Sequence, residues 1–169
     1  MAITTTTYDP VAWSFFAFQG IAAAVVFSNV GAAYGTAKSG IGIGSMAVTR
    51  PALVYKSLIP IIMAGILGIY GLIVAVILYG QIPAVTAISN NPAWGCYSGL
   101  KGFAAGLCAG GSALAAGYAI GVAGDASVRC YGMNQQIFVG MILILIFGEA
   151  IGLYGLIIAI IMSKLSVSS

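Results

Sequence analysis

Four long stretches of this chain carry almost no charge, and each is about as long as a bilayer-crossing helix. The first runs from Val11 to Ala37 and the third from Gly102 to Gly124. A second lies near 57–80, and the fourth, Ile137 to Met162, has Glu149 as its one charged residue. A membrane-spanning helix needs about 20 mostly apolar residues. Only 5% of all residues are charged, against about 25% in ordinary soluble domains. The pattern predicts an all-α integral membrane protein with four transmembrane helices.

The four spans pair into two helical hairpins. We predict an N-terminal tail (1–10), a first hairpin (11–80), a non-cytosolic connecting loop (81–98), a second hairpin (99–164) and a C-terminal tail (165–169). We assign four basic residues to the side of the membrane that holds the joints inside the hairpins: Lys38, Arg50, Lys56 and Arg129. We assign two to the opposite side of the membrane: Lys101 and Lys164. Because basic residues favour cytosolic loops, we expect cytosolic joints and both termini on the luminal side.

The two hairpins have related sequences. Residues 62–78 match residues 146–162 at an offset of 84, with eight identities in seventeen positions and a shared Tyr-Gly-Leu-Ile string. In the first and third spans, Gly31 and Gly35 match Gly117 and Gly121 at an offset of 86, which predicts a shorter joint in the second copy. The pattern indicates a duplicated hairpin with both copies in the same orientation. Parallel repeats of this kind suit a ring of hairpins.

Glycine is abundant and often recurs every fourth residue, as at Gly102, Gly106 and Gly110. Small residues at this spacing let membrane helices approach closely. One interpretation is ordinary helix pairing inside a four-helix subunit. The other is that the first and third spans form a narrow inner circle of helices around the axis of a ring.

Composition excludes several function classes. Six Lys plus Arg, three Asp plus Glu and no His are too few charges for a nucleic-acid surface. Cys96, Cys108 and Cys130 form no CxxC pair and have no His to help them, so we expect no metal site and no disulfide framework. The chain has no phosphate-binding loop of the Walker A type. We therefore expect no catalytic residue and no cofactor, and ATP hydrolysis is not assigned to this chain.

Glu149 is the residue in these spans that can carry out chemistry. It has twelve residues of its span before it and thirteen after it, so it should lie roughly 18 to 20 Å from either end, near the bilayer midplane. An ionised carboxylate there costs about 2.5 to 3.5 kcal/mol on insertion scales, and protonation removes most of that penalty. Residues of this kind are usually functional, and a purely packing role is the alternative. We predict that Glu149 binds and releases a proton.

The counterpart of Glu149 in the first repeat is Gly65, so each chain offers one such site. No basic residue is expected inside the membrane, and a countercharge must then come from another subunit. A sodium ion would need several oxygen ligands, whereas a proton needs the carboxyl group alone, so we favour H⁺ over Na⁺. Tyr70 is a possible hydrogen-bond donor to Glu149 or a packing aromatic, and Ser112 is a further possible oxygen ligand.

Two other polar sets remain. Asn29, beside Ser28, lies at depth in the first span, where a hydrogen bond between helices or a share in ion binding could account for it. Asp125 and Arg129 are four residues apart, which predicts a local ion pair or a cytosolic contact point.

Several strings resemble one known family. They are GAAYGTAKSGIGI (31–43), IPIIMAGILGIYGLIVAVIL (59–78), GYAIGVAGDASVR (117–129) and FVGMILILIFGEAIGLYGLI (138–157). They closely resemble the proteolipid of the eukaryotic vacuolar-type H⁺-ATPase, also known as its c subunit, over nearly the whole chain. Gly148 and Ala150 depart from the residues usual in that family beside its proton-carrying glutamate, which Glu149 matches.

The resemblance implies a rotor ring of proteolipid subunits in the membrane of a vacuole or another acidic compartment. It also implies a stator subunit that supplies an arginine and a rotor stalk subunit on the cytosolic side, with ATP hydrolysed in other subunits. A passive channel or a structural membrane proteolipid is the alternative function. A pore would need polar residues along one helix face, and the spans supply only scattered ones such as Gln19, Ser28 and Asn29.

Overall fold

The computed structural model describes residues 10–82 and 96–164, and helices account for nearly all of them. In chain order these are α1 (Pro10–Thr49), the 3-10 turn η1 (Pro51–Leu53), α2 (Val54–Ser57), α3 (Ile59–Tyr79), α5 (Cys96–Met133), the 3-10 turn η2 (Gln135–Ile137) and α6 (Phe138–Lys164). Within these ranges there is no β-strand, and four helices are long and apolar enough to cross a membrane. The all-α prediction with four spans is confirmed. The predicted tails and most of the 81–98 loop lie outside the described residues.

The first and third spans are longer than the uncharged stretches predicted. The helix α1 continues past Ala37 to Thr49, and α5 runs from Cys96 to Met133. Their 40 and 38 residues make helices about 60 and 57 Å long, roughly twice the hydrocarbon core of a bilayer. The assignment of Lys38 and Arg129 to the joints is therefore wrong. A charged residue ends the apolar stretch but not the helix, because a helix that leaves the hydrocarbon continues in water.

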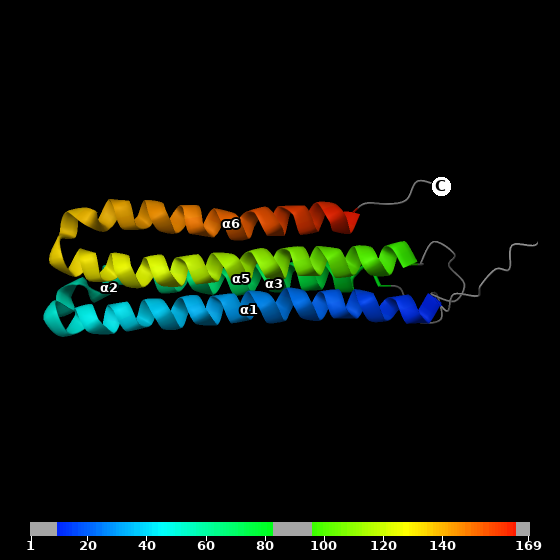
Figure 1. Cartoon of the computed structure of the whole chain (residues 1–169), viewed down its shortest axis with the longest axis horizontal. Coiled ribbons are helices and arrows are strands. Elements are labelled where there is room, and N and C mark those ends of the chain that lie inside the picture. The colour runs from blue at the N-terminus through cyan, green and yellow to red at the C-terminus, as the bar shows by residue number, and fades with distance from the viewer. Residues whose placement is uncertain (1–9, 83–95, 165–169) are drawn as a thin grey trace, which may run out of the picture.

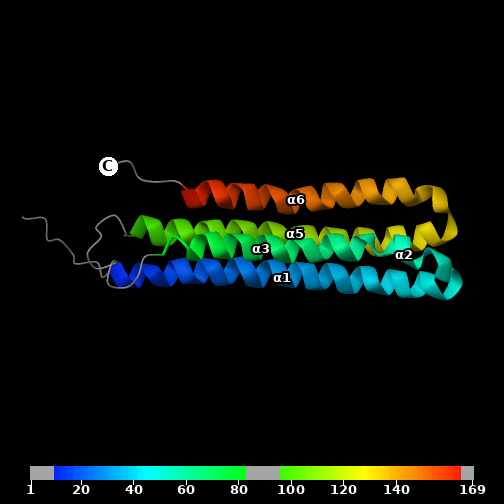
Figure 2. The same ribbon diagram turned by 180° about the vertical axis from the view of Figure 1, so that it is seen from behind.

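The helices form two layers. In Figure 1, α1 and α5 run side by side, and the joints after both helices lie at one end of the bundle. The described chain begins and ends at the other end, so the two hairpins run in the same direction. Seen from behind in Figure 2, α3 lies over the line where α1 and α5 meet, and it contacts both. The helix α6 packs against α5 and α3.

The structure gives one repeat offset, 84, for the whole hairpin. The helix α1 ends at Thr49 and α5 at Met133, and each is followed by an equivalent 3-10 turn. Tertiary contacts repeat at the same spacing. A Cβ atom added to Gly71 would collide with the Ser28 hydroxyl, and one added to Gly155 with the Ser112 hydroxyl. The offset of 86 for the first and third spans, and the shorter second joint, are therefore wrong.

The contact between α1 and α5 explains why glycines match at an offset of 86. A Cβ atom on Gly31 would lie 2.6 Å from the carbonyl oxygen of Ala113, and one on Gly117 would collide with the Gly31 backbone. The counterpart of Gly31 at an offset of 84 is Ala115. Gly31 thus lies between the residues two positions before and two positions after that counterpart. Gly35 lies between Gly117 and Gly121 in the same way. The pairs matched at 86 are contact partners across the interface, and the two repeats have no axial displacement.

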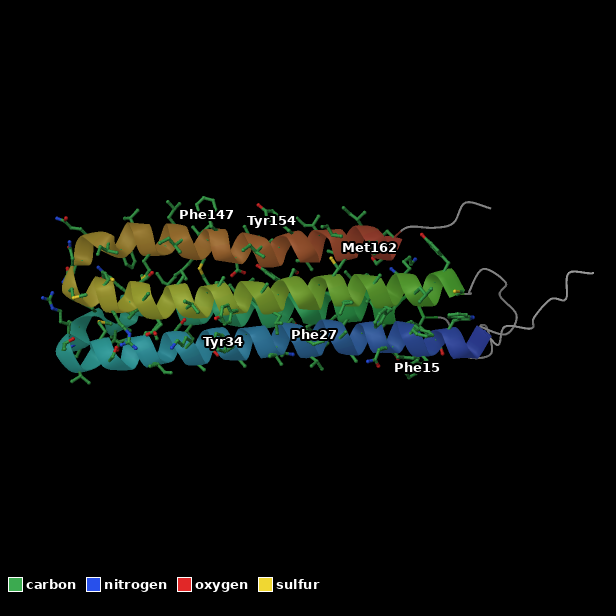
Figure 3. All side chains as sticks on the ribbon, in the orientation of Figure 1. Phe15, Phe27, Tyr34, Phe147, Tyr154 and Met162 are labelled. Carbon is green, nitrogen blue, oxygen red and sulfur yellow. The ribbon has the colours of Figure 1, made fainter. Side chains whose placement is uncertain are left out.

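Large apolar side chains cover the outside of the bundle. Exposed examples lie on every long helix: Phe18, Ile69, Leu107 and Phe147. Figure 3 shows Phe147 and Tyr154 on the side of α6 that faces away from the other helices. The interior is filled by smaller residues, among them Ala64, Ala113 and Ala116, which have no exposed surface. An apolar exterior of this kind suits lipid or further subunits rather than water.

Candidate functional site

Glu149 lies on α6 and is buried, with 8% of its surface exposed. Its partner is Tyr70 on α3, whose hydroxyl donates a hydrogen bond of 2.7 Å to Oε1 of Glu149. The hydrogen bond considered for Tyr70 from the sequence is thus present. Because α3 belongs to the first repeat and α6 to the second, the site is formed only when the two hairpins pack together.

Two glycines on α6 bring Glu149 close to the neighbouring helices. A Cβ atom on Gly148 would lie 3.0 Å from Cγ1 of Ile120 on α5. One on Gly152 would lie 2.6 Å from Cδ2 of Leu67 on α3 and 3.4 Å from Cβ of Ala116 on α5. A larger side chain at either position would require these neighbouring side chains to move. Glu149 therefore lies between two close contacts of α6, one with α5 and one with both α3 and α5.

The second carboxyl oxygen is buried without a partner. Among the described residues, Oε2 of Glu149 accepts or donates no hydrogen bond, and no salt bridge reaches the carboxyl group. A buried ionised carboxylate with a single neutral donor is costly, whereas a carboxylic acid holds its own proton on the free oxygen. The geometry therefore suits a group that is neutral in this conformation and ionises only when another charge approaches.

The other candidate positions lie apart from the carboxyl group. Gly65 is exposed, and a Cβ atom added there would meet nothing within 4 Å. The hydroxyl of Ser112 donates to the Ala109 carbonyl oxygen at 3.0 Å, in its own helix, and faces Gly155. Ser28 likewise bonds within its own helix, to the Ala24 carbonyl oxygen at 2.7 Å. Neither hydroxyl supplies an oxygen ligand beside Glu149.

The sequence suggested a hydrogen bond from Asn29 to another helix. Within the described part of this subunit, Asn29 makes no such bond. Its side chain is on the exposed face of α1. Its Oδ1 atom is directed at α3, where it would lie 2.8 Å from a Cβ atom placed on Gly68. The glycine thus makes room for the amide group, whose hydrogen-bonding capacity is unused inside one subunit.

The ion pair predicted for Asp125 and Arg129 is present, with Nε of Arg129 2.7 Å from Oδ1 of Asp125. Lys38 on α1 joins it, with Nζ 3.5 Å from Oδ2 of Asp125. Sequence spacing revealed the first contact because both residues lie on one helix. The second joins α1 to α5, and no local pattern indicated it.

A bundle of two parallel helical hairpins, with one buried carboxyl group in the second hairpin, defines a tandem-repeat membrane proteolipid. The family of the ATP synthase C subunit matches residues 19–78 and again residues 103–162. This chain belongs to that family. The two matches are offset by 84, in agreement with the contacts between the helices.

Curated relatives are similar over nearly their whole length. The 16 kDa proteolipid of the V-type proton ATPase, its c subunit, from Nephrops norvegicus is 52% identical over 152 residues, covering 90% of this chain and 92% of the relative. The protein of the same name from Ovis aries is 55% identical over 150 residues, covering 89% and 92%. That from Ascaris suum is 54% identical over 151 residues, covering 88% and 89%. The resemblance to vacuolar-type proteolipids is confirmed.

Proposed function

We propose that this chain is a rotor-ring subunit of a vacuolar-type, ATP-driven proton pump, in which Glu149 carries the proton. The observation that carries the proposal is the environment of Glu149, which is buried, accepts one hydrogen bond from Tyr70 and has no partner for Oε2 among the described residues. The names of the relatives, V-type proton ATPase proteolipids, agree with it. The channel and structural alternatives have no comparable support.

The transport cycle follows from the cost of charge in lipid. Glu149 stays protonated while its side of the ring faces lipid, because ionisation within the hydrocarbon is penalised by several kcal/mol. It releases the proton when ring rotation brings it beside the stator's arginine, whose positive charge compensates the carboxylate. Tyr70 remains hydrogen-bonded to Oε1 and positions the carboxyl group in both states. Each charge moved through the membrane potential involves about 2.3 kcal/mol per 100 mV, which the rotor must overcome.

The transported ion is proposed to be H⁺ rather than Na⁺. A sodium ion needs several oxygen ligands, and the hydroxyl of Tyr70 is the one side-chain partner that Glu149 has within the described ranges. No group of three or more acidic, His or Cys side chains gathers there in a metal-binding arrangement. We propose neither a metal nor a cofactor for this subunit.

Ring assembly is supported by the relation between the two repeats. Copies related by rotation with no axial displacement close into a ring, whereas a displacement would generate an open helical filament. Gly31 lies between Ala113 and Gly117, two positions before and two positions after its counterpart in α5, and Gly35 lies between Gly117 and Gly121 in the same way. In the proposed ring, α1 and α5 form the inner circle and α3 and α6 the outer layer.

The remaining partners follow from this role. They are other proteolipid subunits, the stator membrane subunit, a rotor stalk subunit on the cytosolic side, and lipid. The subunit itself is non-catalytic, and ATP is hydrolysed elsewhere in the complex. We place it in a vacuolar or other acidic endomembrane compartment, with both termini on the luminal side.

The deciding experiment replaces Glu149 in the complete pump. Glu149→Gln keeps the size and the hydrogen bond from Tyr70 but removes the titratable group. We expect ring assembly to persist while ATP-driven acidification of membrane vesicles is abolished. Acidification that persists in the variant would overturn the proposal. Proton leak that is independent of ATP and unchanged by the substitution would favour the passive-channel alternative.

A further inference from the structure

The internal repeat specifies how a second copy of this chain meets the first, and this inference rests on the ring proposed above. Within one chain, α3 lies against α5 and α6. Because the repeats are related by an offset of 84 without axial displacement, α6 of one subunit should lie against α1 and α3 of the next. Residues of the site around Glu149 therefore have counterparts across the subunit boundary.

The counterpart of Tyr70 is Tyr154. In this chain Tyr154 is 63% exposed, and Figure 3 shows it pointing away from the other helices. Its position repeats that of Tyr70, whose ring lies against Gly152, with Cδ2 3.7 Å from a Cβ atom placed there, and whose hydroxyl reaches Glu149. Across the boundary, the ring of Tyr154 should therefore lie against Gly68 of the neighbouring copy, with its hydroxyl near Gly65.

The receiving surface is open in the single chain. Gly65 has nothing within 4 Å of an added Cβ atom, and the atoms nearest to one on Gly68 belong to the α1 side chains of Asn29 and Ala32. The Ala32 contact repeats the contact between Gly152 and Ala116. Tyr70 supplies an aromatic ring beside Gly152, whereas no aromatic side chain is among the atoms nearest to an added Cβ atom on Gly68. The surface thus has room for the aromatic ring of a second copy.

The two sites have different side-chain acceptors for the tyrosine hydroxyl. Inside the chain, the tyrosine hydroxyl donates to the carboxyl group of Glu149, and the α5 residue equivalent to Asn29 is the apolar Ala113. At the boundary, the carboxyl group is absent at Gly65, and the counterpart of Ala113 is Asn29, with its Oδ1 directed at Gly68. Each site therefore offers one side-chain acceptor for one tyrosine hydroxyl.

We propose that Tyr154 of one subunit packs against Gly68 of the next copy and donates its hydroxyl to Oδ1 of that copy's Asn29. The contact is a subunit-to-subunit hydrogen bond formed where the first repeat has no carboxyl group. Because the contact contains no carboxyl group, it joins subunits without adding a second site like that of Glu149. Asn29 is thereby assigned to ring assembly rather than to ion binding.

A double-mutant cycle on the intact ring tests this pairing. Tyr154→Phe and Asn29→Leu each remove one side of the hydrogen bond and nearly preserve the side-chain size. Each should shorten the half-life of the purified ring in SDS roughly fivefold, and the double variant should be no worse than either single one. Tyr34→Phe, on a different face, is the matched control and should leave the half-life unchanged. Strictly additive losses would overturn the pairing of Tyr154 with Asn29, and no loss in either single variant would overturn it and place Tyr154 in lipid.

Cross-linking tests the contact between Tyr154 and Asn29 independently of whether the ring exists. In a background without native cysteines, a short thiol-reactive linker should join Asn29→Cys/Tyr154→Cys subunits into a ladder ending at the full ring. Ala113→Cys/Tyr154→Cys is the control and should stay unlinked, because Ala113 is buried inside its own chain. If native mass spectrometry finds a ring but no ladder forms, the contact is wrong while the proposed function stands. A chain that is monomeric before any substitution would overturn both.

Discussion

The hydroxyl of Tyr70 lies 2.7 Å from Oε1 of Glu149, although the two residues are 79 positions apart and belong to different hairpins. This hydrogen bond holds one oxygen of the Glu149 carboxyl group, and among the described residues the other oxygen has no hydrogen-bond partner. The two repeats therefore have different roles at this site, since one supplies the titratable group and the other supplies its donor.

Removal of the Tyr70 hydroxyl should slow proton transport without preventing assembly. Hydrogen bonds to charged groups contribute about 1.5 to 3 kcal/mol, and this one stabilises the carboxylate that must form beside the stator. We expect Tyr70→Phe to lower the rate of ATP-driven acidification roughly tenfold at an unchanged amount of assembled ring. The control is Tyr34→Phe. A transport rate equal to that of the unmodified chain would mean that Tyr70 serves packing only.

Glu149 should be the site of modification by a hydrophobic carbodiimide. The reagent reacts with the protonated carboxyl group, so labelling should be faster at low pH and should slow as pH rises. We expect one label per chain, loss of transport on labelling, and no label in Glu149→Gln, as measured by intact-protein mass spectrometry. Labelling that leaves proton flux unaffected would contradict the carrier role.

The close contact between α1 and α5 should not tolerate a methyl group. In Gly117→Ala, the new Cβ atom would collide with the backbone of Gly31, which cannot turn aside as a side chain can. Overpacking of this kind typically costs about 1 to 3 kcal/mol, and we expect a marked loss of assembled protein. Gly140→Ala is the matched control, because nothing lies within 4 Å of its added Cβ atom. The yield of ring after detergent extraction measures the difference, and equal yields would contradict the packing.

The ion pairs of Asp125 should make a small contribution that depends on salt. The side chain of Asp125 is 14% exposed, but those of Lys38 and Arg129 are 39% and 49% exposed, so solvent screens the pairs. We expect Asp125→Asn to lower stability by about 0.5 to 1 kcal/mol at low ionic strength, and by less in high salt. Thermal unfolding of the detergent-solubilised protein at two salt concentrations provides the measurement. Lys38→Gln, which breaks only the 3.5 Å contact, should have the smaller effect.

The sequence alone was sufficient for the four spans and the duplication of the hairpin, and it singled out Glu149 as the candidate proton site. All three follow from properties that do not depend on packing. Lipid penalises charge wherever a helix places it, so uncharged stretches mark the spans and an isolated carboxyl group stands out. The shared Tyr-Gly-Leu-Ile string is distinctive enough to fix the offset of 84 for the second and fourth helices.

Only the tertiary structure decided the register of the glycine-rich helices and the partners of the polar residues. Glycine and alanine recur at such short intervals that offsets of 84 and 86 both produce matches, and the contacts of Ser28 with Gly71 and Ser112 with Gly155 select the first. The neighbours of Tyr70 and Lys38 likewise depend on how each helix is rotated about its axis. That rotation depends on which small residues allow the helix backbones to touch. Because such a contact involves the surfaces of two helices, neither sequence segment specifies it alone.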